Sequence, residues 1–589
     1  MTAFGYVGRV LCVDLTSGDV HDEPLDLNLA REYLGGSGLA AALLSREDVS
    51  LIDPLGPKNP LIWMTGPPVG TSMPSAGRVS VCALSPLTEI WGEANAGGFF
   101  GPALRFAGYD GIVVRGRAER LVFLSIVDGG PQLHDGGALV GLGTYETQEA
   151  VRALLGLPTA SVACIGEAGE RQVRYAAVLN DHGRAAGRCG LGAVMGSKRL
   201  KAVAVSGRAS IPVADAEALE ATAVEIRAGI EADIAAQAIQ MAGTAGYLDM
   251  ALMYGDLPIR SFRRGEREGA ANLSGVRLTE EFLVRGRACY GCSIACGRET
   301  RAPRFGLDRV DGPEYETLGA LGSLLEIDDL EAVIHAGHLC NVHGLDTIST
   351  GVTIALACEL FERGLMTETD GAPICYGDAN RLPALIERIA RREGIGDLLA
   401  EGSNRLAARF GVPELAVTVK GLEVPMHDPR AFAGMAVTYA LSPRGACHMQ
   451  GDAYSVDTGQ LSVPEAGILP GDRLESSQEK GRTAARTMIW RTIYNALNLC
   501  QFSNPEPQLL LRALEEITGE ARSIEDLMAT GRRILKLKRS INERRGMTSA
   551  ADRLPEVLLQ PLGDGGAQGV VPDLDRLLAG AYDELDWEA

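Results

Sequence analysis

The sequence predicts an α+β protein, in which a β-rich N-terminal base domain is followed by two mainly α-helical domains. Up to residue 205 the apolar runs are short and are separated by glycines and prolines, as at 8–14, 61–65 and 111–115. After residue 211 the apolar residues recur at helical spacing. The length of 589 residues also favours more than one domain.

We expect three domains in order along the chain. The β-rich domain covers residues 1–208 and ends before an amphipathic helical pattern at 216–227. The first helical domain covers 209–420 and includes a cysteine-rich segment. The second helical domain covers 421–589, and no internal repeat is evident in the sequence.

Composition and charge disfavour several classes of partner. The chain is 46% hydrophobic and 22% charged, which is ordinary for a globular protein with large cores. Its net charge of -20 is spread along the sequence, which disfavours nucleic acid and anionic membranes as partners. No run of about 18 apolar residues occurs and the N-terminus lacks a basic signal region, so we expect a cytoplasmic protein without membrane insertion.

Three cysteines crowd into eight positions as Cys289, Cys292 and Cys296. The spacing Cys-x2-Cys-x3-Cys, with Gly291 inside it, allows three sulfurs to converge on one [4Fe–4S] cluster. Cys500 is the best fourth ligand by its context. Scattered core cysteines and a structural zinc site stay open as alternatives, although buried cysteines rarely cluster so closely and zinc sites usually pair two knuckles. A radical S-adenosylmethionine cluster requires the opposite spacing.

Three polar segments rich in glycine lie in the β-rich domain, at 75–78, 95–98 and 180–192. Each combines bare backbone with an arginine or an amide, and each by itself could be a simple turn. Together they favour a ligand that carries phosphate, because arginine and backbone N–H groups bind phosphate oxygens.

These segments and several others resemble one known family. The matching blocks are 75–81, 95–100, 107–116, 192–201, the cysteine triplet, 312–316, 344–349 and 444–448. On these blocks the chain resembles the aldehyde:ferredoxin oxidoreductase family of tungsten-pterin enzymes over essentially its whole length. The resemblance implies a pterin-binding base domain that carries one tungsten on two pyranopterin dithiolenes, with two helical domains around it and one [4Fe–4S] cluster alongside. Molybdenum remains an alternative to tungsten.

The resemblance also implies a set of cofactor-binding residues. In the base domain these are Arg78, Asn95, Gly97, Arg184, Ala185 and Gly187. A Mg²⁺ ion that bridges the two pterin phosphates would take backbone carbonyls near two of them, Asn95 and Ala185. Further contacts come from Asn341, Leu345 and Asp346 in one loop, Asn495 and Leu499 in another, and Arg444 and Gly445.

Both loops depart from the family pattern. Asn341 and Asn495 stand where aspartate is usual, which removes a negative charge. Asn498 replaces a glycine in the second loop. Asparagine tolerates a left-handed backbone better than most residues, so we keep both loops as pterin contacts.

Glu314 and His448 are the catalytic residues that the resemblance implies. Glu314 would act as general base or acid, and His448 would donate a hydrogen bond to the substrate oxygen. Glu316 is the alternative carboxylate, and Cys447 is interpreted as packing. Without the family, Glu314 and His448 would be interpreted as a surface carboxylate and a core histidine.

One expected helix carries Glu331, His335 and His338 on a shared face. We favour a structural role for these side chains. A metal ion that bridges two subunits is the alternative.

The implied function is oxidation of an aldehyde, with water, to a carboxylic acid, or the reverse reaction. Electrons would leave through the cluster to ferredoxin or to an iron–sulfur partner subunit, and we expect a homodimer or a hetero-oligomer. Arg285, Arg287 and Arg298, near the cysteines, are the expected docking site for an acidic ferredoxin. A ring or ene reductase of the benzoyl-CoA reductase type and a non-catalytic electron-transfer subunit are the alternatives.

Overall fold

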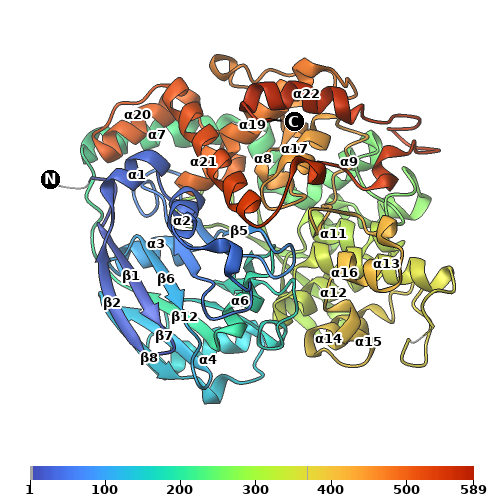
Figure 1. Cartoon of the computed structure of the whole chain (residues 1–589), viewed down its shortest axis with the longest axis horizontal. Coiled ribbons are helices and arrows are strands. Elements are labelled where there is room, and N and C mark those ends of the chain that lie inside the picture. Colours follow the sequence, from blue (N-terminus) through green and yellow to red (C-terminus); the bar gives the residue numbers. More distant parts are fainter. Residues whose placement is uncertain (1–3, 368, 589) are drawn as a thin grey trace.

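Two six-stranded mixed sheets form the N-terminal region of the computed structural model, which describes residues 4–367 and 369–588 (Figure 1). The strands of the first sheet are β1 (Arg9–Asp14), β2 (Asp19–Pro24), β3 (Leu61–Met64), β4 (Val79–Leu84), β5 (Trp91–Ala96) and β6 (Gly111–Arg115). Those of the second are β7 (Val122–Val127), β8 (Gly130–Asp135), β9 (Ser161–Cys164), β10 (Val178–Asn180), β11 (Arg184–Ala186) and β12 (Leu200–Ser206).

The two sheets have the same topology. The strand order is β2-β1-β6-β3-β4-β5 in the first sheet and β8-β7-β12-β9-β10-β11 in the second. β1 pairs in parallel with β6, and β7 pairs in parallel with β12, whereas the other neighbours pair antiparallel. The base domain is therefore a structural duplication. The sequence does not reveal it, because a fold requires a shared pattern of burial and not shared residue identities.

Helices from each half of this duplication pack on the sheet of the other half. α3 (Phe100–Phe106) joins β5 to β6 but packs on β9 and β12, and its counterpart α6 (Leu191–Ser197) packs on β3, β4 and β5. The largest hydrophobic core joins side chains of both sheets and continues into the helical part of the chain. α2 (Gly36–Ser45) and α4 (Thr144–Leu155) cover the outer faces. The short helix α1 (Leu27–Tyr33) packs on α2, and the short helix α5 (Glu167–Glu170) packs on α6.

The rest of the chain is mainly helical, which confirms the predicted α+β class. Its helices are α7 (Ala216–Ala232), α8 (Ile234–Ala242), α9 (Leu248–Tyr254), α10 (Gly275–Arg277), α11 (Tyr315–Leu321), α12 (Leu330–His343), α13 (Thr347–Glu362), α14 (Leu382–Arg391), α15 (Ile395–Leu399), α16 (Ser403–Arg409), α17 (Gly434–Leu441), α18 (Ala453–Asp457), α19 (Gln478–Leu497), α20 (Pro507–Thr518), α21 (Ile524–Arg544) and α22 (Leu574–Leu585). In Figure 1, α11 to α16 lie to the right of the sheets, and α17, α19, α21 and α22 lie above them.

Two small sheets complete the fold. β13 (Leu283–Arg287), β14 (Gly297–Ala302) and β15 (Leu307–Asp311) form the first, and the cysteine triplet lies in the loop between β13 and β14. β16 (Thr418–Val419) and β17 (Leu422–Glu423) form a hairpin with residue 420 in its turn. The domain boundaries at 208 and 420 stay predictions.

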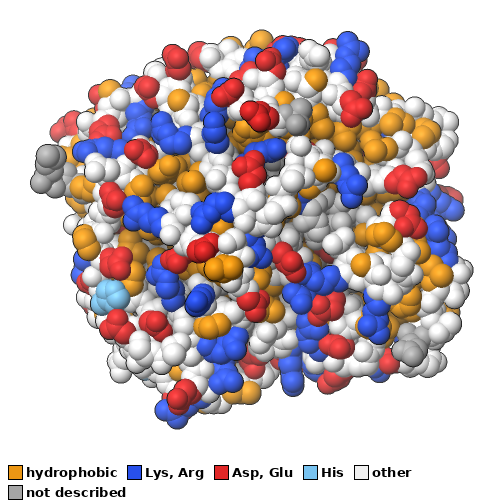
Figure 2. Space-filling view, viewed as in Figure 1, with side chains coloured by type: hydrophobic (Ala, Val, Ile, Leu, Met, Phe, Trp, Pro, Cys, Tyr) orange, Lys and Arg blue, Asp and Glu red, His pale blue; other side chains and the backbone are white. Residues whose placement is uncertain are grey.

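Basic and acidic side chains intermingle on the visible face of the molecule (Figure 2). Across residues 4–367 and 369–588, no helix is both long and apolar enough to cross a membrane.

Candidate active site

A cavity of about 340 Å³ lies where the edge strands β5 and β11 of the two sheets meet. Loops from the helical part of the chain form its other walls. The wall contains most of the residues that the sequence suggested: Arg78, Asn95, Gly97, Arg184, Ala185, Gly187, Cys289, Cys292, Cys296, Glu314, Asn341, Leu345, Asp346, Arg444, His448 and Cys500.

Backbone hydrogen bonds hold the cysteine loop, a glycine segment and Cys500 together. The Tyr290 N–H donates to the Gly98 carbonyl (3.1 Å), and the Ser75 N–H donates to the Gly291 carbonyl (3.0 Å). The Cys500 N–H donates in turn to the Ser75 carbonyl (3.0 Å). Cys500 therefore reaches the same cavity as the triplet, although it is distant in sequence.

In the described part of the chain, no three of the four sulfurs lie within 4.8 Å of one another. In the part of the chain that the structure describes, two groups bring three metal-ligating atoms within 4.8 Å of one another, and neither includes these cysteines. A zinc ion with Zn–S bonds of about 2.3 Å would hold its thiolates roughly 3.8 Å apart. A [4Fe–4S] cluster is larger and binds one thiolate at each iron. This donor set therefore fits the cluster.

The cavity wall carries more positive than negative side chains. Among the residues that the structure describes, the basic ones on the wall are Arg78, Arg184, Arg188, Arg287, Arg298 and Arg444. The acidic ones are Asp311, Glu314, Glu316 and Asp346. Arg78 donates to the Asn95 carbonyl (3.1 Å). A Cβ at Gly97 would come within 2.9 Å of the Cys289 sulfur, so a larger residue there would displace this sulfur. A surplus of guanidinium donors beside bare backbone fits phosphate groups.

The two loops with matching sequence patterns also share one backbone structure. α12 is capped at its C-terminus by Gly344 (φ 74°) and α19 by Asn498 (φ 57°), both in the left-handed region. In each loop the following N–H, of Leu345 or Leu499, returns to the carbonyl five residues earlier, at 2.8 Å and 3.0 Å. Both loops are therefore Schellman motifs, and Asn498 takes the position that glycine usually occupies.

Each loop packs on an equivalent glycine of the duplicated domain. Gly66 follows β3, and Gly166 follows β9, the counterpart of β3. A Cβ at Gly66 would lie 2.4 Å from the Leu497 carbonyl oxygen, and a Cβ at Gly166 would lie 2.3 Å from that of His343. The duplication therefore extends to the loops that close the cavity. A cavity built this way fits a ligand with two similar halves.

Three residues of the predicted cofactor-binding set lie behind the wall. Asn495 accepts a hydrogen bond from the Asn95 side chain (2.9 Å), and Leu499 is buried. Gly445 (φ 96°) forms a turn in which a Cβ would come within 2.6 Å of Leu422 Cβ. None of the three is among the residues that line the cavity, and Asn495 supports the wall through its bond to Asn95.

Glu314 lies on the cavity wall immediately before α11. Its Oε2 accepts a hydrogen bond from the Thr244 hydroxyl (2.5 Å), and this hydroxyl accepts one from the Tyr315 N–H (3.0 Å). Thr244 therefore fixes the orientation of the Glu314 carboxylate.

Glu316, also on the wall, lies beside two imidazoles. Its Oε1 is 3.3 Å from His448 Nδ1 and 3.6 Å from His427 Nε2. Burial lowers the pKa of His448 far below its usual range and raises the pKa of Glu316. Among the described residues, neither Glu316 Oε1 nor His448 Nδ1 has a hydrogen-bond partner. A neutral imidazole beside a carboxyl that protonates easily suits proton exchange with a bound ligand.

Sequence reasoning missed His427 and Asp256, which extend this group away from the cavity. His427 Nδ1 is 2.7 Å from Asp256 Oδ2, which also accepts a hydrogen bond from the Tyr247 hydroxyl (3.0 Å). Burial opposes charge on His427, but the Asp256 carboxylate outweighs it and raises the pKa of His427. The only signal in the sequence was a His-Asp pair between two prolines at 425–429.

The histidines of α12 have aromatic neighbours. His335 stacks on Phe305 and His338 stacks on Tyr145, with ring centroids 4.2 Å and 5.7 Å apart. Glu331 accepts a hydrogen bond from a nearby backbone N–H (2.6 Å). These contacts favour the structural role for this face of the helix.

Two family profiles together match most of the chain. Residues 10–207 match "Aldehyde ferredoxin oxidoreductase, N-terminal domain", and residues 221–589 match "Aldehyde ferredoxin oxidoreductase, domains 2 & 3". The chain belongs to the aldehyde ferredoxin oxidoreductase family. Its duplicated sheets therefore form the N-terminal domain of that family, and its helical part corresponds to domains 2 and 3.

Individual relatives of this aldehyde ferredoxin oxidoreductase family member cover nearly its full length. The tungsten-containing aldehyde ferredoxin oxidoreductases of Pyrococcus furiosus and Thermococcus kodakarensis are each 39% identical, over 99% of this chain and 96% of their own. An aliphatic sulfonate oxidoreductase, WOR-like subunit, of Pyrococcus furiosus is 28% identical, over 99% of this chain and 95% of its own.

A solved structure shares the whole fold. The active site complex BamBC of benzoyl coenzyme A reductase, in complex with 1,5-dienoyl-CoA, is 25% identical and has a TM-score of 0.86. The match covers 100% of this chain and 95% of that chain.

Proposed function

We propose that this protein oxidises aldehydes, with water, to carboxylic acids in a reversible reaction that depends on tungsten. One observation carries the proposal: a single cavity joins four cysteines, a repeated wall of arginine and glycine, and an ionisable Glu–His group. The relatives at 39% identity are named for tungsten and for aldehyde, which supports the same activity here. An aldehyde and water give a carboxylic acid, two protons and two electrons.

The side chains present fit a tungsten bis-pyranopterin and one [4Fe–4S] cluster. The cluster would be held by Cys289, Cys292, Cys296 and Cys500. The pterins and their phosphates would contact Arg78, Asn95, Gly97, Arg184, Ala185, Gly187, Asn341, Leu345, Asp346 and Arg444, with Mg²⁺ at the carbonyls near Asn95 and Ala185. When bound, the tungsten centre takes two electrons from the substrate, and the cluster transfers them singly.

Glu314 and His448 act on the substrate in this proposal. Glu314, oriented by Thr244, takes the proton of the attacking water as a general base. His448 stays neutral because burial lowers its pKa. Burial raises the pKa of Glu316. A proton on its Oε1, 3.3 Å from His448 Nδ1, would keep this nitrogen an acceptor and leave the Nε2–H of His448 to donate to the substrate oxygen. Glu316 is therefore a positioning residue.

The electrons leave near the cysteine loop, between β13 and β14. The family name supports ferredoxin as the acceptor, and an iron–sulfur partner subunit is the alternative. The protein is proposed to act in the cytoplasm as a homodimer or within a hetero-oligomer.

Aldehyde-dependent reduction of a viologen dye tests the activity. Protein with full tungsten and iron should reduce the dye with at least one aliphatic or aromatic aldehyde. Activity with none of them would contradict the proposal. Reduction of an aromatic acyl-CoA to a dienoyl-CoA would then favour the ring-reductase alternative, which the similar BamBC structure supports.

Iron analysis tests the cluster separately. Wild-type protein should contain about four irons per chain, and Cys292→Ala and Cys500→Ser should each lose most of this iron, because each removes one of four ligands. Cys375→Ser is the matched control, since Cys375 is exposed and lies outside the cavity wall. Zinc in place of iron in the wild type would rule out the assignment.

A further inference from the structure

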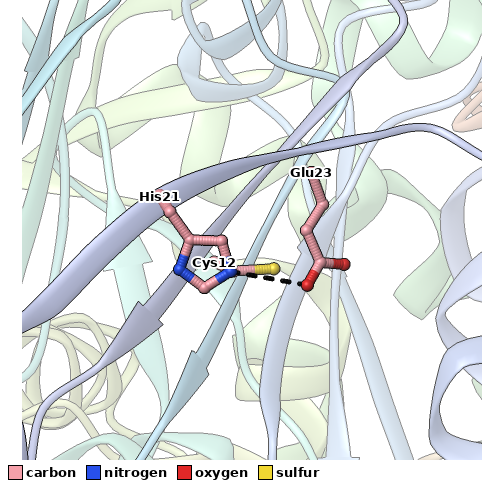
Figure 3. A group of neighbouring side chains, drawn as sticks. All are labelled: Cys12, His21 and Glu23. Atoms are coloured by element: carbon pink, nitrogen blue, oxygen red, sulfur yellow. Dashed lines mark ion pairs between the residues drawn. The ribbon is translucent and has the colours of Figure 1, made fainter.

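We propose that Cys12, His21 and Glu23 form a binding site for one Zn²⁺ ion on the β1–β2 hairpin, at the far edge of the first sheet from the cavity. The Cys12 sulfur, a His21 ring nitrogen and a Glu23 carboxylate oxygen all lie within 4.8 Å of one another. Figure 3 shows the sulfur directed between the imidazole and the carboxylate. A thiolate, an imidazole and a carboxylate are the ligand types that zinc uses in proteins.

The strand register brings these three side chains to one face of the sheet. Cys12 is paired directly with His21, and Val10 is paired with Glu23, in the antiparallel ladder of β1 and β2. Side chains two residues apart on a strand share a face, so His21 and Glu23 both stand beside Cys12. His21 Nε2 is 3.5 Å from Glu23 Oε1, close to the spacing of two ligands on one zinc ion.

The surroundings of His21 and the exposure of the site both suit a metal ion. His21 Nδ1 is 2.8 Å from Asp19 Oδ2. A carboxylate on the second ring nitrogen is the usual partner of a histidine that binds metal, because it fixes the tautomer and leaves the other nitrogen to the ion. Cys12 is held in the sheet and is 6% exposed, whereas the His21 and Glu23 side chains are 49% and 60% exposed. The ion can therefore reach the buried sulfur from solvent, between the two exposed ligands.

The local charge also favours a cation. The carboxylates of Asp19, Glu23 and Asp22 lie on this hairpin, and Asp22 is paired with Arg9 (2.9 Å). Arg115 lies near Cys12, but Glu47 pairs with it (2.6 Å). Burial and Glu23 raise the pKa of Cys12 to about 12, so the metal must displace the thiol proton.

The second half of the duplicated domain has a hairpin equivalent to β1–β2, and its side chains at the three positions differ. The equivalent hairpin, β7–β8, pairs Ser125 with Gln132 and places His134 at the position of Glu23. There Ser125 Oγ is 2.7 Å from His134 Nε2. The same backbone is therefore built without a thiol or a carboxylate, so the fold does not require the Cys–His–Glu group.

Zinc titration of the full-length, cofactor-loaded protein tests the proposal. The protein is first dialysed against a chelator and then titrated with Zn²⁺ in competition with a chromophoric chelator. One equivalent should bind, and zinc-edge X-ray absorption should show one sulfur at about 2.3 Å. Cys12→Ser should remove that sulfur, and His21→Gln and Glu23→Gln should each weaken binding at least tenfold. Asp19→Asn should weaken it about tenfold.

Two variants serve as controls. His134→Gln, on the equivalent hairpin, and Cys375→Ser, at an exposed cysteine, should leave the affinity unchanged. The exposed variants His21→Gln and Glu23→Gln test the site without changing the buried position 12. The proposal is wrong if no equivalent binds, if the bound zinc has no sulfur ligand, or if His21→Gln and Glu23→Gln bind as tightly as the wild type.

Discussion

Glu314 and Glu316 are two residues apart and both reach the cavity, yet their partners differ. Glu314 is held by the Thr244 hydroxyl, whereas Glu316 faces His448 and His427. Replacement of Glu314 by Gln keeps volume and shape but removes basicity. Glu314→Gln should therefore lower kcat by roughly 10²–10⁴-fold in the dye assay, with unchanged tungsten and iron.

The control for this variant is Glu220→Gln, because Glu220 is exposed on α7, away from the cavity wall. It should keep full activity. Full activity in Glu314→Gln with normal tungsten would show that Glu314 is not the general base, and Glu316 would then be the candidate.

At the scale of elements, the two Schellman loops differ in where their asparagines lie. Asn341 lines the cavity and donates to the Asp311 carbonyl (3.1 Å), whereas Asn495 lies behind Asn95. Asn341→Asp adds a negative charge at the wall and should lower the midpoint potential of the bound cofactor. Asn495→Asp should change it much less.

Redox titration of the two variants measures this difference. Both should retain tungsten, because an aspartate at 495 still accepts the hydrogen bond from Asn95, and Asn341→Asp loses only the bond donated to the Asp311 carbonyl. Equal shifts in the two variants, or loss of the cofactor from both, would contradict the placement of these loops.

α12 should make the stability of the protein sensitive to acid. Burial lowers the pKa of His338 from 6.5 to about 4. The unfolded chain binds this proton near pH 6.5 and the folded chain only near pH 4, so stability that is present above pH 6.5 is lost as the pH falls toward 4. Between pH 7 and pH 5 the unfolding free energy of the wild type should therefore fall by about 2 kcal/mol more than that of His338→Gln.

Denaturant unfolding at the two pH values measures this loss, and loss of the stacking on Tyr145 affects both values equally. Glu220→Gln, at an exposed position on α7, is the control and should leave the pH dependence unchanged. An unchanged pH dependence in His338→Gln would mean that the buried imidazole is protonated in the folded protein.

At the scale of the whole molecule, a net charge of -20 opposes an acidic ferredoxin, so docking requires a local basic surface. The surface predicted from sequence was partly wrong. Arg298 is 4% exposed and donates to the carbonyls of Ile239 and Gln240, so it is not available to a partner. Arg285 and Arg309 are exposed around the buried Glu299, to which both are paired.

Arg285→Glu combined with Arg309→Glu should therefore slow ferredoxin reduction, because the surface near the cysteine loop that these two arginines make basic becomes acidic. Reduction of a small viologen dye should not change. The difference should shrink at high salt, since screening weakens charge pairing. Equal rates with both acceptors would place the docking surface elsewhere.

Several features followed from the sequence because their signals are local. The fold class came from short apolar runs followed by helical periodicity, and the chemistry came from Cys289, Cys292 and Cys296 within one loop. The left-handed position of Asn498 also followed from local preference, since asparagine tolerates that backbone. Such patterns depend on neighbouring residues, which the sequence displays directly.

Other features required the tertiary structure, because they join residues that are distant in the chain. Asn495 was predicted as a cofactor contact, and its position behind Asn95 depends on how the end of α19 meets Ser80 and Asn95 of β4 and β5. His427, Glu316 and Asp256 are far apart in the sequence. Only the folded chain places the His427 ring between the other two side chains. The sequence by itself determined the class of fold, the ligand types and the family. The tertiary structure determined the duplication, the cavity between its halves and the partners of each charge, since burial and distance arise only after the chain has folded.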